Sequence, residues 1–215
     1  MIRGLIFDLD GLLLDTEKLY NVFWKKACGD FGFLLNDKDA LSLRSMSGEN
    51  AERRFKEIFG ESFDYKAVRA HRINLMDEYI EQNGIEQKPY AKEFLSLAKK
   101  KGYVLSTATT SPYKRAEKLL KKAGMFEYFD AFACGDMVLK SKPAPDIFLL
   151  AAKKLSLSPD ECIGFEDSPN GIKACIAAGI KAVMIPDLSQ PDDELKKRLY
   201  SLKTSLKDAA GLLVR

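Results

Sequence analysis

Short apolar runs alternate with amphipathic stretches from about residue 88 onward, and this alternation constrains the fold more than any other feature of the chain. The strand-like runs span 103–108, 129–134, 162–165 and 182–185. The helix-like stretches between them span 89–101, 112–124, 147–155 and 169–178, and glycine closes several of them. A further apolar run, Leu5-Ile6-Phe7, lies near the start. Strands that alternate with helices predict a parallel sheet with right-handed crossovers. We therefore predict an α/β fold with a doubly wound, Rossmann-like parallel sheet.

Residues 16–87 interrupt the alternation with helical patterns and no convincing strand. The patterns span 16–29, 48–59 and 66–83. Two of them carry apolar stripes at helical spacing: Leu19, Val22, Phe23 and Ala27 in one, and Val68, Leu75, Met76, Tyr79 and Ile80 in the other. We predict that residues 1–15 and 88–215 form an α/β catalytic core and that residues 16–87 form an inserted all-helical cap domain.

The first apolar run ends in Asp8-Leu9-Asp10-Gly11. Residues two apart on a strand point the same way, so Asp8 and Asp10 are expected to face one spot. Two converging carboxylates raise one pKa or require a cation between them, which favours a magnesium site, a carboxylate nucleophile, or both. The alternative is that Asp10-Gly11 is a turn and Asp8 a local cap.

Two further polar clusters, Thr109 to Ser111 and Glu166-Asp167, come directly after strand-like runs, and Lys142 lies in a loop reached from another such run. In an open α/β sheet the ligand crevice lies outside the carboxyl ends of the strands, so the fold brings these clusters together. Each has a structural alternative: Ser111 as the N-cap of the next helix, Lys142-Pro143 as a surface loop, and Glu166-Asp167 as charges that complement a helix dipole. Together they suit phosphoryl transfer, because magnesium and lysine neutralise phosphate while hydroxyl and backbone N–H groups donate to its oxygens.

Composition excludes several other classes. The 34 basic and 31 acidic residues are spread along the chain, so we expect no nucleic-acid partner. The single histidine, His71, lies in a helix-like segment, which leaves Ser-His-Asp or Cys-His hydrolysis and histidine-rich zinc sites without support. The glycine-rich motifs of dinucleotide and P-loop binding are absent from the sequence. Four cysteines in apolar contexts indicate buried thiols in a reducing compartment.

The same sequence gives no sign of a membrane protein. No stretch approaches the length of a transmembrane span, and Asp8 and Asp10 interrupt the apolar run that a signal peptide would need. We expect a cytoplasmic monomer without membrane or nucleic-acid partners, acting on a small phosphorylated metabolite.

The motifs Asp8-Leu9-Asp10-Gly11, Thr109, Lys142-Pro143 and Glu166-Asp167 resemble the four motifs of the haloacid dehalogenase-like hydrolases. The resemblance is closest to the branch with a helical cap after the first motif, which includes β-phosphoglucomutase and many small sugar-phosphate and nucleotide phosphatases. It extends from Ile2 to about Pro186. It implies that Asp8 is the nucleophile that becomes an aspartyl phosphate. Asp10 is then the general acid/base, which protonates the leaving oxygen and later activates water.

The same resemblance assigns the binding residues. It implies that Thr109 and Lys142 bind the phosphoryl group, with Thr110 supplying backbone contacts. It also implies a magnesium cofactor whose main ligand from the last motif is Asp167, with Glu166 as its neighbour, directly or through water. Asp8 and the backbone carbonyl of Asp10 complete this metal site.

Departures from the mutase branch favour a phosphatase. Mutases of this kind carry a histidine where this chain has Tyr20, and a cap arginine in the region of residues 47–50, where none aligns. The Asp15-Thr16-Glu17 segment resembles phosphatases of pseudouridine, sugar or polyol phosphates, although Asp15 also suits the N-cap of the first cap helix. We therefore predict a magnesium-dependent phosphatase of a sugar, polyol or nucleoside monophosphate.

Three alternatives stay open. The first is a phosphomutase like β-phosphoglucomutase. The second is a phosphorylation-responsive signalling domain, which would be about half as long and would carry its acceptor aspartate on a middle strand. The third is an inactive relative that acts as a binding protein. Substrate specificity is expected in the cap, where the candidates are Glu17, Tyr20, Arg44, Glu49 and Arg53.

Overall fold

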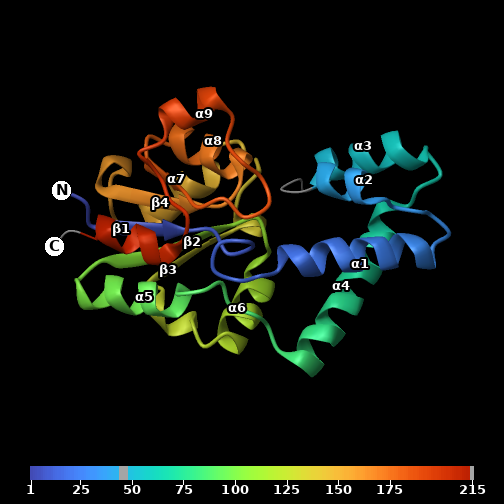
Figure 1. Ribbon diagram of the computed structural model, residues 1–215, viewed down its shortest axis with the longest axis horizontal. Coiled ribbons are helices and arrows are strands. Elements are labelled where there is room, and N and C mark those ends of the chain that lie inside the picture. Colours follow the sequence, from blue (N-terminus) through green and yellow to red (C-terminus); the bar gives the residue numbers. More distant parts are fainter. Residues whose placement is uncertain (44–47, 214–215) are drawn as a thin grey trace. The chain divides into compact units, whose positions relative to one another are not determined.

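The computed structural model describes residues 1–43 and 48–213 (Figure 1). The chain divides into two compact units, one formed by Met1–Asp15 with Glu86–Arg215 and the other by Thr16–Ile85. We call them the sheet unit and the helical unit. Arg44 and position 47, named above among the cap positions, lie outside the described residues. The role of the helical unit as a cap domain stays a prediction.

The sheet unit contains one parallel sheet, which confirms the predicted doubly wound α/β fold. Among the described residues it has six strands in the order β3-β2-β1-β4-β5-β6. The strands are β1 (Gly4–Phe7), β2 (Val104–Thr109), β3 (Ala131–Cys134), β4 (Cys162–Glu166), β5 (Lys181–Met184) and β6 (Ser201–Leu202). The short edge strand β6 was not predicted, because two residues are too few to show a period-two pattern.

Helices cover both faces of this sheet (Figure 1). They are α5 (Ala91–Lys100), α6 (Tyr113–Lys122), α7 (Asp146–Lys154), α8 (Pro169–Ala177), α9 (Asp193–Arg198) and α10 (Leu206–Ala209). Single 3-10 turns lie at Phe126–Tyr128, Gly135–Met137, Pro159–Glu161 and Ala210–Leu212. The predicted helices are present with shifts of one or two residues at their ends, whereas α9 and α10 were not predicted.

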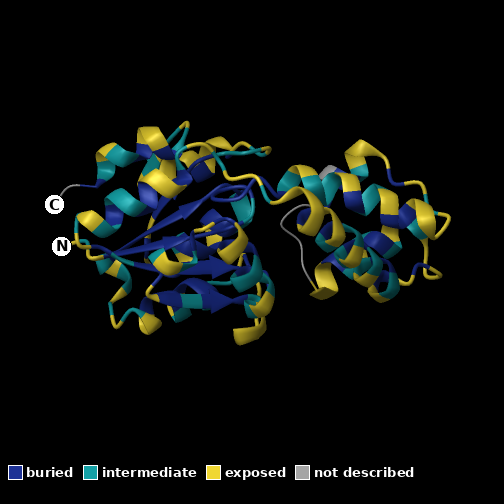
Figure 2. Ribbon diagram, turned by 90° about the horizontal axis from the view of Figure 1, so that it is seen from below, coloured by how far each residue is buried: buried dark blue, intermediate teal, exposed yellow. Residues whose placement is uncertain are grey.

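The side chains of β1 show why this central strand is apolar throughout. Ile6 packs into one buried cluster with Phe148 of α7 and Ile172 of α8. Its neighbour Phe7 points to the opposite face, where its ring stacks on Phe165 at a centroid distance of 5.0 Å. Because both faces are covered, β1 has no polar side, and Figure 2 shows most of the sheet in the colour of buried residues.

Strand order places a topological switch point beside β1. From β1 the chain first builds β2 and β3 on one side, and then β4, β5 and β6 on the other. The two neighbours of β1 are therefore β2 and β4, with Phe7 paired with Thr107 and with Phe165. Ligands of doubly wound proteins bind outside the carboxyl ends of the strands at such a point.

The helical unit contains α1 (Glu17–Asp30), α2 (Asp37–Ser42), α3 (Gly48–Phe59) and α4 (Tyr65–Asn83). The short helix α2 was not predicted. Phe23, Ala27, Val68, Met76 and Ile80 are buried as the stripes predicted. Two other stripe residues are exposed, contrary to prediction: Val22 by 58% and Tyr79 by 42%. Arg72 is buried instead, with its guanidinium 4.9 Å from the centroids of the Tyr20 and Trp24 rings.

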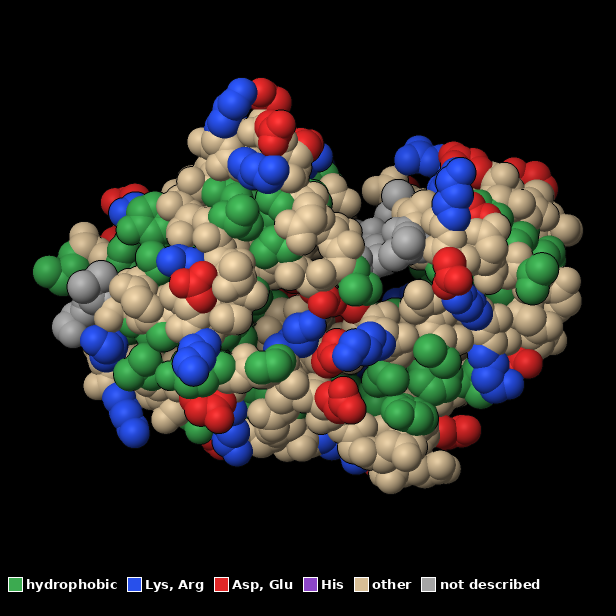
Figure 3. Space-filling view, viewed as in Figure 1, with side chains coloured by type: hydrophobic (Ala, Val, Ile, Leu, Met, Phe, Trp, Pro, Cys, Tyr) green, Lys and Arg blue, Asp and Glu red, His purple; other side chains and the backbone are tan. Residues whose placement is uncertain are grey.

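Three further observations bear on the expectations drawn from the composition and the sequence. Acidic and basic side chains are interspersed over the face shown in Figure 3. All four cysteines are buried free thiols, as expected: Cys28, Cys134, Cys162 and Cys175. Within residues 1–43 and 48–213, none of the helices is long and apolar enough to cross a membrane.

Candidate active site

Asp8 follows directly on β1 and is placed by the strand register. Its N–H donates to the carbonyl of Phe165 at 3.0 Å, which continues the pairing of β1 with β4 by one residue. The next residue of β4 is Glu166, so the two acidic residues are neighbours at the carboxyl edge of the sheet. Asp8 is 7% exposed and Glu166 1% exposed. Such burial of adjacent carboxylates requires a cation.

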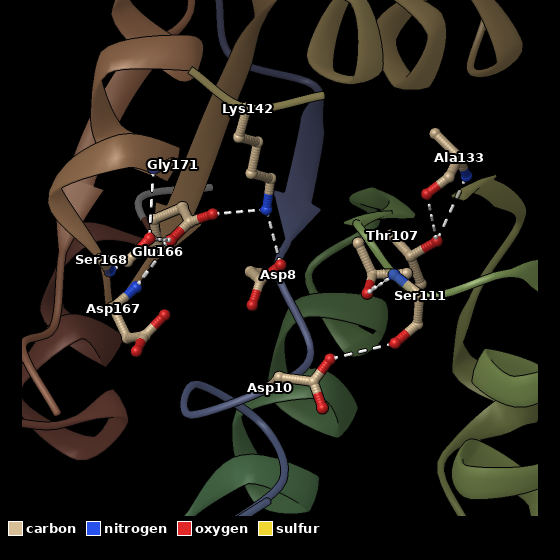
Figure 4. Close-up of polar contacts among 11 residues, drawn as sticks. Asp8, Asp10, Thr107, Ser111, Ala133, Lys142, Glu166, Asp167, Ser168 and Gly171 are labelled. Atoms are coloured by element: carbon tan, nitrogen blue, oxygen red, sulfur yellow. Dashed lines mark hydrogen bonds and ion pairs between the residues drawn. The ribbon is translucent and has the colours of Figure 1, made fainter. Parts of the chain in front are cut away.

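Lys142 supplies that cation from the loop between β3 and α7 (Figure 4). Its Nζ lies 2.6 Å from Oδ1 of Asp8 and 2.5 Å from Oε1 of Glu166. The residue is 8% exposed, so the predicted alternative of a surface loop is wrong for its side chain. Desolvation by itself would lower the pKa of Lys142, but the two carboxylates outweigh it and raise the pKa above its ordinary value. Lys142 is therefore a fixed positive charge at the site.

The pKa of Asp8 reflects the same surroundings. Burial raises it well above its ordinary value, the Lys142 ammonium opposes this shift, and the nearby Glu166 and Asp10 carboxylates add to it. A divalent cation bound beside Asp8 would lower the pKa again, because it favours the charged form. The carboxylate form of Asp8 thus depends on cations around it.

Glu166 is held from its other side by the start of α8. Its Oε2 accepts hydrogen bonds from the N–H of Asp167 at 3.1 Å, the N–H of Ser168 at 3.1 Å and the hydroxyl of Ser168 at 3.0 Å. The Ser168 hydroxyl also accepts from the N–H of Gly171 and so caps α8. The predicted interaction of Glu166 with a helix N-terminus exists, and the same carboxylate also binds Lys142.

The acidic residues form a group that fits a hard cation. One carboxylate oxygen from each of Asp8, Glu166 and Asp167 lies within 4.8 Å of the others, and all three side chains are buried. Magnesium prefers such oxygen ligands and uses few carboxylates. Both oxygens of Glu166 already have partners, on Lys142 and at the start of α8. Glu166 is therefore held from two sides within this group.

Asp10 reaches the site by a turn. The prediction that Asp8 and Asp10 point the same way as residues two apart on one strand is wrong, because Asp10 lies beyond the end of β1. β1 ends at Phe7, and the chain turns at Gly11, which has a φ of 84° that favours glycine. The Gly11 N–H donates to the carbonyl of Leu14 at 2.8 Å. The Asp10 carboxylate points toward the loop after β2, where Oδ2 accepts a hydrogen bond from the Ser111 hydroxyl at 3.2 Å (Figure 4). The alternative interpretation of Asp10-Gly11 as a turn is correct, and the turn is what directs Asp10.

The polar cluster after β2 forms the second side of the site. Thr109 is the last residue of β2 and is buried, and its Oγ1 accepts a hydrogen bond from the Ser111 N–H at 3.1 Å. Thr110 follows and is half-buried. Ser111 was predicted to be the N-cap of α6, and this is wrong. The helix begins at Tyr113, and its N-cap is Pro112. The Ser111 hydroxyl binds Asp10 instead.

The structure thus separates the predicted residues into two groups joined by the loop from Asp8 to Asp10. Asp8, Lys142, Glu166 and Asp167 lie together beside β4. Asp10 is linked to the cluster after β2 through Ser111. The sequence placed Ser111 in this polar cluster, but its hydrogen bond to Asp10 was not predicted.

Asp15 lies outside both groups, and it is not at the N-cap position of α1. The N-cap position of α1 is Thr16. The Asp15 carboxylate lies 3.6 Å from the ammonium of Lys88, which also lies 2.8 Å from Asp187. The predicted N-cap role of Asp15 is therefore wrong.

Comparison with known proteins identifies the family of the chain. Residues 2–179 match the family model described as haloacid dehalogenase-like hydrolase. The chain belongs to this family. The match includes every residue of the two groups above and confirms the resemblance drawn from the motifs.

Similar proteins of this family include phosphatases and a mutase. The fructose-1-phosphate phosphatase YqaB of Escherichia coli is 31% identical over 180 residues, which cover 84% of this chain and 94% of that protein. The phosphorylated carbohydrates phosphatase of Thermotoga maritima is 29% identical over 215 residues, with 99% and 90% covered. The crystal structure of β-phosphoglucomutase from Clostridium difficile matches with a TM-score of 0.81 and 28% identity, over 96% of this chain and 92% of that one.

Proposed function

We propose that this haloacid dehalogenase-like hydrolase is a phosphatase that releases phosphate from a sugar, polyol or nucleoside monophosphate through an aspartyl phosphate on Asp8. The observation that carries the proposal is the position of Lys142, 2.6 Å from Asp8, at an edge where Asp167 offers a further carboxylate. A buried carboxylate beside a fixed ammonium can meet a phosphate dianion, which a carboxylate alone would repel.

In the first step an oxygen of Asp8 attacks the phosphorus atom, and the bond from phosphorus to the substrate oxygen breaks. Asp10 gives its proton to that leaving oxygen, so that a neutral alcohol departs. The Lys142 ammonium and the Thr109 hydroxyl bind the oxygens of the transferred group, together with backbone N–H groups around Thr110. The product left on the enzyme is the aspartyl phosphate.

In the second step water attacks the phosphorus of the aspartyl phosphate. Asp10, now a carboxylate, takes a proton from this water, and the bond between phosphorus and the Asp8 oxygen breaks. Inorganic phosphate leaves and Asp8 is again a carboxylate. The hydrogen bond from Ser111 places Asp10 for both proton transfers.

Asp8, Asp167 and the backbone carbonyl of Asp10 would hold a magnesium ion, with Glu166 beside it. When bound, the ion would supply positive charge that neutralises the phosphoryl oxygens. We further propose that the helical unit sets substrate specificity as a cap domain, through residues such as Glu17, Tyr20, Glu49 and Arg53.

A phosphomutase is the second candidate, favoured by the similarity to the β-phosphoglucomutase structure. Tyr20 argues against it. A mutase must protect its aspartyl phosphate from water until a sugar arrives, and mutases of this family carry a histidine at that position. Tyrosine has an ordinary pKa of about 10 and cannot change charge near neutral pH.

The test is a panel of phosphorylated metabolites incubated with the protein and magnesium, with free phosphate as the readout. The panel contains fructose 1-phosphate, hexitol phosphates and nucleoside monophosphates, with a chelator added in parallel. We expect phosphate release from at least one of them, abolished by the chelator. A second reaction contains β-glucose 1-phosphate with a trace of the bisphosphate. Rapid formation of glucose 6-phosphate without free phosphate would overturn the phosphatase proposal in favour of the mutase.

A further inference from the structure

Gly171, in the first turn of α8, lies directly against the Glu166 carboxylate (Figure 4). A Cβ atom at this position would lie 1.8 Å from Oε1, 1.9 Å from Cδ and 2.3 Å from Oε2 of Glu166. Its φ is not among the positive values of this chain, so the helix itself does not require glycine there. Residue 171 must therefore lack a side chain for a steric reason, because the Glu166 carboxylate occupies the volume that the Cβ of any other residue would fill.

The Glu166 carboxylate cannot simply move aside to admit a Cβ. It is 1% exposed, one of its oxygens binds Lys142, and the other accepts three hydrogen bonds at the start of α8. A shift large enough to relieve contacts under 2 Å would break several of these bonds together. Lys142 would then lose one of its two carboxylate partners and would be held by Asp8 alone.

We propose that Gly171 is a positioning residue of the active site. The Glu166 carboxylate occupies the volume that a side chain at residue 171 would fill, and Glu166 in turn holds the Lys142 ammonium in place beside Asp8. The inference rests on the proposed function, because Lys142 is placed for phosphoryl transfer. It extends that function to a residue with no side chain and no contact with the substrate. A displacement of about 1 Å of such a group is enough to slow catalysis strongly.

The test is the variant Gly171→Ala, examined by crystal structure and by kcat and KM for phosphate release. We expect the Lys142 Nζ to Glu166 Oε1 hydrogen bond to be lost and kcat to fall by about tenfold or more, with a smaller change in KM. The matched control is Gly4→Ala on β1, at the opposite end of the sheet. A Cβ there would lie 2.6 Å from Cδ1 of Leu157, so this variant is also crowded. It should lose stability while kcat stays unchanged.

The double variant Glu166→Ala/Gly171→Ala separates positioning from a merely structural role. The three atoms nearest to a Cβ at residue 171 all belong to the Glu166 carboxylate, so Glu166→Ala removes these contacts. Alanine is also a better helix former than glycine. We therefore expect Gly171→Ala to lower the melting temperature when it is introduced into the wild type, and to raise it when it is introduced into Glu166→Ala. In the Glu166→Ala background it should change kcat by less than about twofold. If Gly171→Ala fails to fold, the double variant still tests the proposal, because it should fold.

An unchanged Lys142–Glu166 contact in Gly171→Ala would overturn the inference. So would an equal loss of stability or of kcat in the two backgrounds, because the effect would then not act through Glu166. If the wild type releases no phosphate while the crystal structure and the melting temperatures behave as expected, the positioning role stands and the phosphatase proposal fails.

Discussion

The Lys142 ammonium lies 2.6 Å from Oδ1 of Asp8, although 134 positions separate the two residues in the sequence. Two features of the fold produce this contact. The register of β1 with β4 places Asp8 beside Glu166. The loop after β3 then brings Lys142 between the two carboxylates.

The first prediction concerns Lys142→Met, which leaves Asp8 and Glu166 buried without their shared cation. Breaking a buried ion pair by removing one partner costs about 3 kcal/mol or more in free energy of unfolding. We expect a loss of this size in urea titrations without magnesium. Magnesium should restore more stability to the variant than to the wild type, because it can replace the missing positive charge.

The control for this experiment is Lys173→Met, which alters an exposed lysine of α8. It should change the free energy of unfolding by less than about 0.5 kcal/mol. A Lys142→Met variant as stable as this control would contradict the account of the buried ion pair.

The second prediction concerns the metal site and the variant Asp167→Ala. Removing one carboxylate from so small a ligand set should weaken magnesium binding by about tenfold or more. Titration calorimetry measures this directly and does not depend on turnover. Asp160→Ala, which removes an exposed carboxylate, is the matched control and should bind magnesium like the wild type. Equal affinity of Asp167→Ala and the wild type would show that Asp167 is not a ligand.

The third prediction concerns Ser111→Ala, which removes the hydrogen bond to Asp10. Because Asp10 transfers the proton in both proposed steps, we expect kcat to fall by about tenfold, with a smaller change in KM. Ser111→Thr keeps a hydroxyl and should recover most of the rate. If Ser111→Ala retains the full kcat, the hydrogen bond seen in the structure has no role in placing Asp10.

Sequence patterns predicted the sheet and most of the polar residues at its carboxyl edge, because both depend on local signals. Short apolar runs identify strands such as β1 and β4, and polar residues at the ends of these runs identify the edge of the sheet where ligands bind. The three clusters at strand ends could therefore be placed at one edge without knowledge of the structure, and the loop with Lys142 was expected to reach the same edge.

The remaining features depend on tertiary contacts. The burial of Arg72 depends on rings that α1 brings over α4, which no stripe of apolar residues reveals. The contact between Glu166 and Lys142 depends on a loop whose course the sequence does not specify. Ser111 was predicted to cap α6, because a serine before a proline suits that position, but its hydroxyl binds Asp10 instead.

The central claim is that Asp8 carries the phosphoryl group during turnover, and rapid-quench labelling tests it most directly. The protein is mixed with the panel substrate that it hydrolyses fastest, labelled with radioactive phosphate, and stopped in acid within one turnover. We predict label on the peptide that contains Asp8, removed by hydroxylamine. In Asp8→Asn the label should be absent and phosphate release lower by about 1,000-fold or more, with the fold unchanged. Phosphate release at the normal rate by Asp8→Asn would contradict the account.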